Sequence, residues 1–417
     1  MRTSELNTLS HDLDHTAERP SLWRRLLAGW MALSLILHPA LVYAADVVAA
    51  PGAAGPAVGQ SANGTTVVNI VAPNGAGVSH NQYQQFNVGA GGVILNNGYQ
   101  LNQTQQAGWI EGNPNLRNGS ARIILNEVTG TQPSLLRGMT EVGGSRAEVI
   151  IANPNGISCN GCGFINTSRA GLVTGTPLFG GDGSLQAFRV TGGQLDISGN
   201  GLNANNIDQM DLLSRAIIIN GQLQGKQLNL IAGSNQVDYA SLSTQQIAGN
   251  GTAPQVAIDS SLLGGMYANK IRLVGTEAGV GVTLRGEMAS RSEDIQISSN
   301  GTLTLNNKIS SAGGIQLKSQ GTLSQDQTVY GQGAVQVQAG GQLQQNGLLA
   351  AGQSLQVQAA SIDSRAQLVS GLQTDGRVLT GHNLTLNSTG QVRLQQGLTS
   401  GGNLQVNAGQ LQVDGNV

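Results

Sequence analysis

The sequence predicts an all-β protein built as a parallel β-helix, a solenoid whose coils stack along one axis. The first observation is the composition, with 60 glycines in 417 residues, 11% charged residues and 3% aromatic residues. Ordinary soluble chains are about 25% charged and about 7% glycine. The second observation is a constant repeat interval in the last third of the chain. Together they favour thin aliphatic coils over a disordered chain or a collagen, which need high net charge or a Gly-X-Y period.

The repeat is a short alternating segment. Four copies begin at equal intervals, from position 295 to 315, 335 and 355, and two more follow after a longer step, at 384 and 404: Ile295-Gln-Ile, Ile315-Gln-Leu, Val335-Gln-Val, Leu355-Gln-Val, Leu384-Thr-Leu and Leu404-Gln-Val. Alternation places the Ile, Leu and Val side chains on one face of a strand and Gln or Thr on the other. The longer step predicts one coil that carries an inserted loop.

A unit of this length, with two or three short strands, cannot bury its apolar face alone, but stacked units can. Layers about 4.8 Å apart favour slim branched side chains, which accounts for the scarcity of aromatic residues. The competing interpretation is a stack of antiparallel hairpins, because the chain contains many Asn-Gly pairs and Asn-Gly is a hairpin-turn signal. Their spacing is irregular while the repeat interval is constant, so we favour parallel coils.

Residues 1–45 have the pattern of a secretory signal peptide. A long polar segment ends in Arg24-Arg25, a short apolar run follows at 26–37, and small residues lead to Ala44 and Ala45. A membrane anchor is the alternative, but a spanning helix needs about 20 apolar residues. We therefore expect cleavage after Ala44 or Ala45 and export from the cytoplasm.

Residues 46–290 share the strand character with less regularity. Alternating runs are separated by Gly and Asn at roughly the spacing of a coil. The segment 46–62, rich in Ala, Pro and Gly, is expected to be a flexible leader into the first strand. The irregular part is expected to cap the solenoid, because an uncovered coil exposes an unpaired strand edge.

Two related motifs lie in this part of the chain. The first consists of Asn113, Pro114, Asn115 and Leu116, and the second of Asn153, Pro154, Asn155, Gly156 and Ile157. Pro presets φ, while Asn and Gly tolerate positive φ, so both motifs predict tight turns. Because the motifs are near-copies that follow strand-like runs, they are also candidates for a paired recognition element.

Cys159 and Cys162 are the two cysteines of the chain. In an exported protein they are expected to form a disulfide that closes a tight loop. A structural zinc site would need four ligands, and no second CxxC or nearby His is present. A thioredoxin-like redox motif would need a helix after the first Cys, whereas the intervening Asn-Gly predicts a turn.

Residues 291–417 are predicted to be β-helical stalk repeats. The sequence stops at Val417 within a repeat and without a capping segment. We therefore expect a truncated piece of a longer fibre.

The composition argues against catalysis and against nucleic acid as a partner. The formal charge of −2 provides no basic surface for nucleic acid. Beyond residue 45 the only histidines are His80 and His382, so a Ser-His-Asp or Cys-His arrangement is not expected. No catalytic residue, metal site or cofactor is predicted. The alternative function is a secreted polysaccharide-active β-helix enzyme, for which the nearest cluster is Asp196, Asp208, Asp211 and Arg215.

Several stretches together resemble one family. They are Val78-Ser-His-Asn-Gln-Tyr-Gln-Gln-Phe-Asn-Val88, Gly92-Val-Ile-Leu-Asn-Asn97, the first Asn-Pro-Asn motif, the segment 147–166 that contains the second motif and both cysteines, and Leu228-Asn-Leu-Ile-Ala-Gly-Ser-Asn-Gln-Val-Asp238. They resemble the haemagglutination-activity, or two-partner-secretion, domain of filamentous haemagglutinin-like exoproteins. The resemblance covers residues 46–290, and the cysteine pair matches the branch with haemolysins and contact-dependent inhibition proteins. Residues 1–25 do not clearly match the extended signal pattern of the family.

The resemblance implies a right-handed β-helix with an N-terminal cap and short extra-helical strands. It also implies Sec export, recognition in the periplasm by the POTRA domains of an outer-membrane β-barrel transporter, and a place on or outside the surface of a Gram-negative bacterium. In the family, the two Asn-Pro-Asn motifs support folding and secretion. The expected function is to present an adhesive or toxin-bearing filament to a host or neighbouring bacterial cell.

Overall fold

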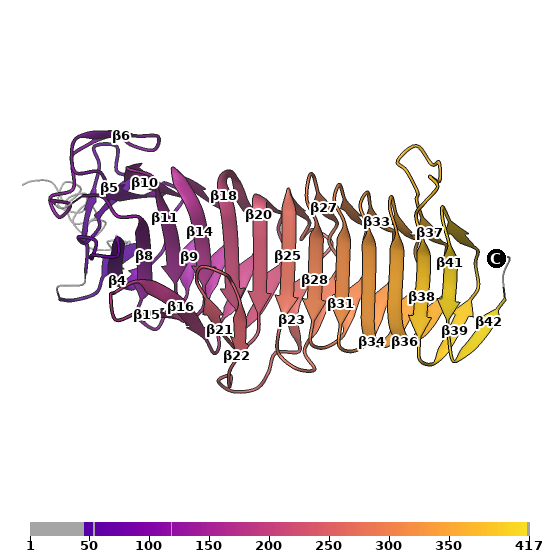
Figure 1. Cartoon of the computed structure of the whole chain (residues 1–417). Coiled ribbons are helices and arrows are strands. Elements are labelled where there is room, and N and C mark those ends of the chain that lie inside the picture. The colour runs from indigo at the N-terminus through magenta and orange to yellow at the C-terminus, as the bar shows by residue number, and fades with distance from the viewer. Residues whose placement is uncertain (1–45, 53–54, 118, 415–417) are drawn as a thin grey trace, which may run out of the picture. The chain divides into compact units, whose positions relative to one another are not determined.

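The computed structural model describes residues 46–52, 55–117 and 119–414. Asp46–Val417 form one compact unit, in which β-coils stack along a single axis (Figure 1). The predicted signal peptide and its cleavage after Ala44 or Ala45 lie outside the described residues.

Most coils contribute one strand to each of three parallel sheets, and we number these sheets for reference. The first sheet follows the order of pairing β4 (Val78–Phe86), β8 (Ile123–Val128), β11 (Ala147–Ala152), β14 (Thr167–Val173), β18 (Leu202–Ser214), β20 (Leu223–Ala232), β25 (Lys270–Gly275), β28 (Ile295–Ser299), β31 (Ile315–Ser319), β34 (Val335–Gln345), β36 (Leu355–Ser364), β38 (Leu384–Ser388) and β41 (Leu404–Asn407).

The second and third sheets complete the coils, and long strands such as β34 and β36 bend from the first sheet into the second. The second sheet also contains β9 (Ser134–Leu136), β12 (Ile157–Cys159), β17 (Gln194–Ile197), β19 (Ala216–Ile219), β23 (Val256–Ser260), β26 (Gly281–Leu284), β29 (Leu303–Leu305), β32 (Leu323–Gln325), β39 (Gln391–Leu394) and β42 (Gln410–Val413). The third contains β3 (Thr66–Asn69), β5 (Val93–Asn97), β10 (Met139–Gly144), β13 (Cys162–Ile165), parts of β18 and β20, β24 (Met266–Ala268), β27 (Met288–Ser290), β30 (Ile309–Ser311), β33 (Val329–Gly331), β35 (Leu349–Ala351), β37 (Leu368–Ser370) and β40 (Leu398–Ser400).

The predicted parallel β-helix and its repeat register are confirmed. The six repeat positions that begin the alternating segments stack directly on one another, in the order Ile295, Ile315, Val335, Leu355, Leu384 and Leu404. The longer step between Leu355 and Leu384 is an inserted loop between β37 and β38, which projects from the stack near its C-terminal end (Figure 1). Because adjacent coils pair in parallel, the hairpin-stack alternative is wrong.

Antiparallel pairing is found at the N-terminal end and in two excursions from the coils. β1 (Val47–Ala49) pairs with β4, and β2 (Ala57–Gln60) pairs with β3. Val47 is buried, so the expected flexible leader at 46–62 is wrong where β1 and β2 form. The first excursion is the hairpin of β6 (Asn102–Thr104) and β7 (Gly108–Ile110).

The second excursion is a four-stranded antiparallel sheet, which we call the extra-helical sheet. It consists of β15 (Thr176–Phe179), β16 (Leu185–Val190), β21 (Asn235–Asp238) and β22 (Thr244–Gln246). In Figure 1 its strands lie beside β8 to β20 and do not extend along the strands from β28 onward.

The molecule has two apolar cores. The larger core fills the coils from Val47 to Leu394 with Ile, Leu, Val and Ala. The smaller core lies outside the coils, where Phe188, Val190 and Val237 of the extra-helical sheet pack on the outward side chains of the first sheet. Outward residues of the first sheet are apolar beneath the extra-helical sheet, because burial of apolar area is favourable.

One line of outward positions on the first sheet changes character along the axis, and we call it the outer row. Its members in order of pairing are Ala152, Val173, Leu213, Ile231, Val274, Ser298, Lys318, Gln338, Gln358, Asn387 and Asn407. The first four are buried and belong to the smaller core. The row becomes polar at Ser298, where the extra-helical sheet has ended.

Candidate functional site

The first Asn-Pro-Asn motif forms the turn by which the chain returns from the β6–β7 hairpin to the coils. Asn113 is 2% exposed, and its side-chain amide donates to the carbonyl oxygens of Ile70 and Asn96, each at 2.9 Å. Asn113 Oδ1 accepts the backbone N–H of Asn115 at 3.0 Å, which makes an Asx turn. The N–H of Leu116 donates to the Asn113 carbonyl at 3.2 Å and completes the turn. One buried amide therefore ties this turn to β5 and to the end of β3.

The second motif repeats this arrangement after β11. Asn153 is fully buried, and its amide donates to the Gln132 carbonyl at 2.9 Å and to Ser134 Oγ at 3.0 Å. Its Oδ1 accepts the backbone N–H of Asn155 at 3.0 Å, and its carbonyl accepts the N–H of Gly156 at 3.1 Å. Gly156 has φ +119°, a conformation that favours glycine. The buried amide again ties a turn to the coil before it.

The two motifs bury and expose the same positions. The Asn that begins each motif and the aliphatic residue that ends it are buried, while the Pro and the second Asn are exposed in both: Pro114, Asn115, Pro154 and Asn155. The first motif precedes β8 and the second follows β11, and these strands pair side by side. Among the hydrogen bonds of the described residues, none joins one motif to the other. The structure therefore holds two equivalent turns at opposite ends of neighbouring strands, and not one contiguous element.

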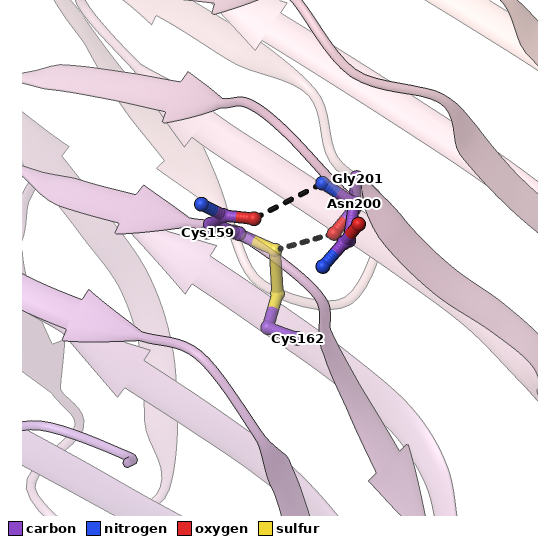
Figure 2. Close-up of a disulfide and its surroundings, with 5 residues drawn as sticks. Cys159, Cys162, Asn200 and Gly201 are labelled. Carbon is purple, nitrogen blue, oxygen red and sulfur yellow. Dashed lines mark hydrogen bonds between the residues drawn. A yellow bond between two sulfur atoms is a disulfide. The ribbon is translucent and has the colours of Figure 1, made fainter. Parts of the chain in front are cut away.

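The two cysteines lie at a corner between β12 and β13, where Cys159 and Cys162 form a disulfide with a Cα–Cα distance of 5.4 Å (Figure 2). Both residues are buried in the larger core. The Sγ of Cys159 lies 3.3 Å from the carbonyl oxygen of Gly201 in the next coil, and Asn160 Oδ1 accepts the N–H of Asn200 at 3.0 Å. The disulfide therefore cross-links two residues of one coil, and this corner stacks on Asn200 and Gly201 of the next coil.

A buried ion cluster, which sequence reasoning missed, fastens the extra-helical sheet to the first sheet. Arg169 Nε donates to Asp211 Oδ2 at 2.6 Å, and Arg169 Nη2 donates to the carbonyl of Tyr239 at 2.7 Å. The guanidinium lies 4.2 Å from the centre of the Tyr239 ring, and the Tyr239 hydroxyl donates to Glu148. Burial alone would lower the pKa of Arg169, but the nearby carboxylates of Asp211 and Glu148, together with the hydrogen bond to Asp211, raise it overall. Burial also raises the pKa of Tyr239 well above its usual range, so its hydroxyl remains a donor.

A second contact with the extra-helical sheet is a ring contact at His80, beside a polar cluster that joins β4 to β8 within the first sheet. His80 Nε2 lies 2.7 Å from Glu127 Oε2, and Gln82 Nε2 donates to the same oxygen at 3.1 Å. Burial tends to raise the pKa of Glu127, but the hydrogen bonds from His80 and Gln82 outweigh burial and lower it. The ring of Phe179 in β15 lies 5.0 Å from the His80 ring. His80 therefore packs between the first sheet and the extra-helical sheet, which is a structural role.

The four residues of the alternative enzyme hypothesis do not form one site. They make separate contacts: Asp208 with Arg146 at 3.0 Å and Lys226 at 2.9 Å, Asp211 with Arg169 at 2.6 Å, and Arg215 with Glu277 at 2.8 Å. Asp196 lies on the second sheet, and partial burial raises its pKa. Each of Asp208 and Asp211 is neutralised by a cation, whereas a glycosidase needs two carboxyl groups that face one substrate.

The described residues contain no group of three or more His, Cys, Asp or Glu side chains placed to hold a metal ion. In the same part of the chain, no helix has the length and apolar character to cross a membrane.

The part of the chain that holds both Asn-Pro-Asn turns and the extra-helical sheet matches a known family. A family profile described as "TPS secretion domain" matches residues 45–305. "tRNA nuclease CdiA-2" of Burkholderia pseudomallei (strain 1026b) is 47% identical over 300 residues, which are 69% of this chain and 10% of that protein. "16S rRNA endonuclease CdiA" of Enterobacter cloacae subsp. cloacae is 48% identical over 290 residues, or 69% of this chain and 9% of that protein. The chain thus spans about a tenth of the length of these relatives, whose names describe the much longer proteins.

A solved structure shares the architecture. The "Crystal structure of filamentous hemagglutinin secretion domain" aligns with a TM-score of 0.59 and 30% identity, covering 87% of this chain and 99% of that one. The profile match covers more than half of the residues and includes both Asn-Pro-Asn turns, the disulfide and the extra-helical sheet. The chain therefore belongs to the TPS secretion domain family of two-partner secretion exoproteins.

Proposed function

We propose that residues 46–290 are the export domain of a secreted exoprotein. The Sec machinery carries the chain to the periplasm, the predicted signal is removed after Ala44 or Ala45, and the POTRA domains of an outer-membrane β-barrel transporter recognise the export domain. The family match supports this proposal, as does the pattern at residues 1–45. No acid–base pair or metal site of the described residues favours the enzyme alternative.

The observation that carries the proposal is the pair of equivalent turns. Asn113 and Asn153 each bury an amide against the preceding coil while presenting an exposed Pro-Asn edge. The second Asn also holds its turn in both motifs, because Asn115 donates to the Ile70 carbonyl at 3.1 Å and Asn155 to the Gly130 carbonyl at 2.8 Å. We propose that these edges belong to the surface on which export depends.

Residues 291–417 are proposed to begin a β-helical stalk that holds an adhesive or toxin-bearing segment away from the cell. Such a filament would act at the surface of a Gram-negative bacterium, on a host cell or a neighbouring bacterium. The regular stacking from β28 to β42 supports a rigid spacer, because each coil rests on the one before it.

The test compares buried amides of two regions in the full chain, expressed with its transporter in a Gram-negative host. Asn113→Ala and Asn153→Ala remove the amides of the two motifs, while Gln345→Ala removes a fully buried stalk amide that donates to the carbonyls of Gly347 and Gln367. Each change removes a buried side-chain amide that donates two hydrogen bonds and should destabilise its coil by about 1–3 kcal/mol.

Secretion into the medium is the readout, with periplasmic chain and unfolding measured in parallel. We expect the two motif variants to lower secretion by about tenfold and Gln345→Ala to lower it by less than about twofold, a difference of more than about 1 kcal/mol. Equal losses in all three variants would mean that the motifs act only through stability. Undiminished secretion without the transporter would overturn the proposed partner.

A further inference from the structure

A groove of about 680 Å³ runs along β2 at the N-terminal end of the unit. One wall consists of β2 and the turn after it, and the other is the end of the β6–β7 hairpin from Trp109 to Gly112. Asn63 in the β2–β3 turn donates its side-chain amide to the carbonyl of Gln106 at 2.8 Å, which holds the two walls together. Pro114, from the exposed edge of the first Asn-Pro-Asn motif, also lines the groove.

Among the described residues, the strand that forms one wall is paired on one side only. All four residues of β2 are exposed, and β3 is its one strand neighbour in the described part of the chain. The N–H of Ser61 donates to the carbonyl of Thr65 at 2.9 Å, so this pair is hydrogen-bonded. Alternation along an antiparallel pair then directs the backbone N–H and C=O groups of Val58 and Gln60 away from β3. Within the described part of the chain these groups form a free sheet edge, to which another extended chain can add.

The two walls together supply apolar surface, and the wall formed by the hairpin also supplies one charge. Trp109 is 65% exposed and Val58 is 40% exposed, although large apolar side chains at the coils are almost all buried. An exposed Trp beside a groove is typical of a binding anchor. The single charged side chain in the lining is that of Glu111, which favours a cationic group in the occupant.

We propose that this groove receives a β-strand of the export partner. The strand adds to the free edge of β2, places an apolar side chain against Trp109 and Val58, and places Lys or Arg opposite Glu111. The inference rests on the proposed function and names the surface that the periplasmic domains of the transporter contact. The first motif then contributes directly, because its buried Asn113 holds Pro114 in the wall of the groove.

The test uses residues 46–417, which form a compact unit and contain Trp109 as their single tryptophan. The probe is the soluble periplasmic portion of the transporter that exports this chain. Binding should shift the emission of Trp109 to shorter wavelength, because the partner removes it from water. Calorimetry gives the Kd, and light scattering reports whether the chain associates with itself.

Three variants and one control separate the elements of the surface. Gln60→Pro removes an N–H that points away from β3, and Gln60→Ala is the matched control that keeps it. Trp109→Ala removes the apolar anchor and Glu111→Lys reverses the charge; both positions are exposed, so folding should persist by circular dichroism. We expect about tenfold weaker binding for Gln60→Pro and Trp109→Ala, weaker binding for Glu111→Lys, and less than about twofold change for Gln60→Ala.

The outcomes distinguish the surface from the function. If wild type binds and Trp109→Ala, Glu111→Lys and Gln60→Pro bind equally well, the groove is not the contact and the proposed function stands. If wild-type chain does not bind the periplasmic domains and is exported without the transporter, both proposals fail. Self-association that Gln60→Pro abolishes, with no binding to the transporter, would make a second copy the occupant and overturn the inference.

Discussion

The two halves of the first sheet share one backbone arrangement but differ in the residues on their outward side. From Ala152 to Ile231 the outer row is apolar and buried beneath the extra-helical sheet, whereas from Lys318 to Gln358 it is polar and exposed. The larger core inside the coils is mainly aliphatic in both halves, with Tyr83, Phe86 and Phe164 in its N-terminal part. The difference shows that both regions share the stacking of coils and differ in what covers the outward side of the first sheet.

This difference has consequences for stability. The extra-helical sheet joins residues that are far apart in the chain, as in the pairing of Ala187 with Asp238 and the contact of Arg169 with the Tyr239 carbonyl across 70 positions. The stalk is held mainly by contacts between one coil and the next. We therefore expect the export domain, residues 46–290 (the export region below), to unfold as one cooperative unit. In the stalk, we expect a destabilising change to affect only the neighbouring coils, as in other repeat proteins.

The largest expected effect tests the second core. Phe188→Ala should destabilise the export region by about 3–5 kcal/mol, because Phe188 is 1% exposed in the core beneath the extra-helical sheet. Hydrogen exchange should show faster exchange in β11, β14, β18 and β20, and unchanged exchange in β31 to β36.

The matched change in the stalk is Leu317→Ala, which removes an inward side chain that is 1% exposed. Its effect should be confined to β28, β31 and β34. If Phe188→Ala weakens protection equally along the whole stack, the separation into a cooperative export region and a local stalk is wrong.

A smaller effect is expected when an apolar and a polar residue of the outer row are each replaced by the other kind. Ile231→Gln places an amide in the smaller core and should cost about 1–3 kcal/mol, whereas Gln338→Ile changes an exposed position and should alter stability by less than about 0.5 kcal/mol. Chemical denaturation measures both. Similar costs for the two variants would show that cover by the extra-helical sheet does not set the character of the row.

The stalk could be predicted from the sequence because its information is local. Each alternating segment defines its own inward face, and the constant interval sets which residues stack, as with Ile295 on Ile315 and Val335. The longer step before Leu384 predicted the inserted loop for the same reason. An insertion that lengthens a regular repeat can be predicted from the sequence without knowledge of any long-range contact.

The N-terminal end and the extra-helical sheet could not be derived in this way. The alternation of β16 at Leu185–Val190 resembles that of a coil strand, but its partner Asn235–Asp238 is distant in the sequence. Only the family resemblance implied extra-helical strands. The segment 46–62 looked flexible because of its Ala, Gly and Pro content, yet β1 pairs with β4 and buries Val47.

The candidate site was predicted in part. The Asn-Pro-Asn motifs were recognised as turns from their residue types, but turn Asn residues are usually exposed. The buried amides of Asn113 and Asn153 depend on carbonyls of earlier coils, such as Ile70 at 43 positions' distance. The contact between Arg169 and Asp211 was missed for the same reason, since neither residue belongs to a local motif.

Export of a chain shortened after Leu305, where the family match ends, tests the central claim most directly. Residues 1–305 retain both motifs, the disulfide, the groove and the complete extra-helical sheet. We predict that this chain reaches the medium in a transporter-dependent manner, folded and with its signal removed, and that Asn113→Ala within it lowers export. Retention of the shortened chain in the periplasm, or equal export without the transporter, would contradict the account.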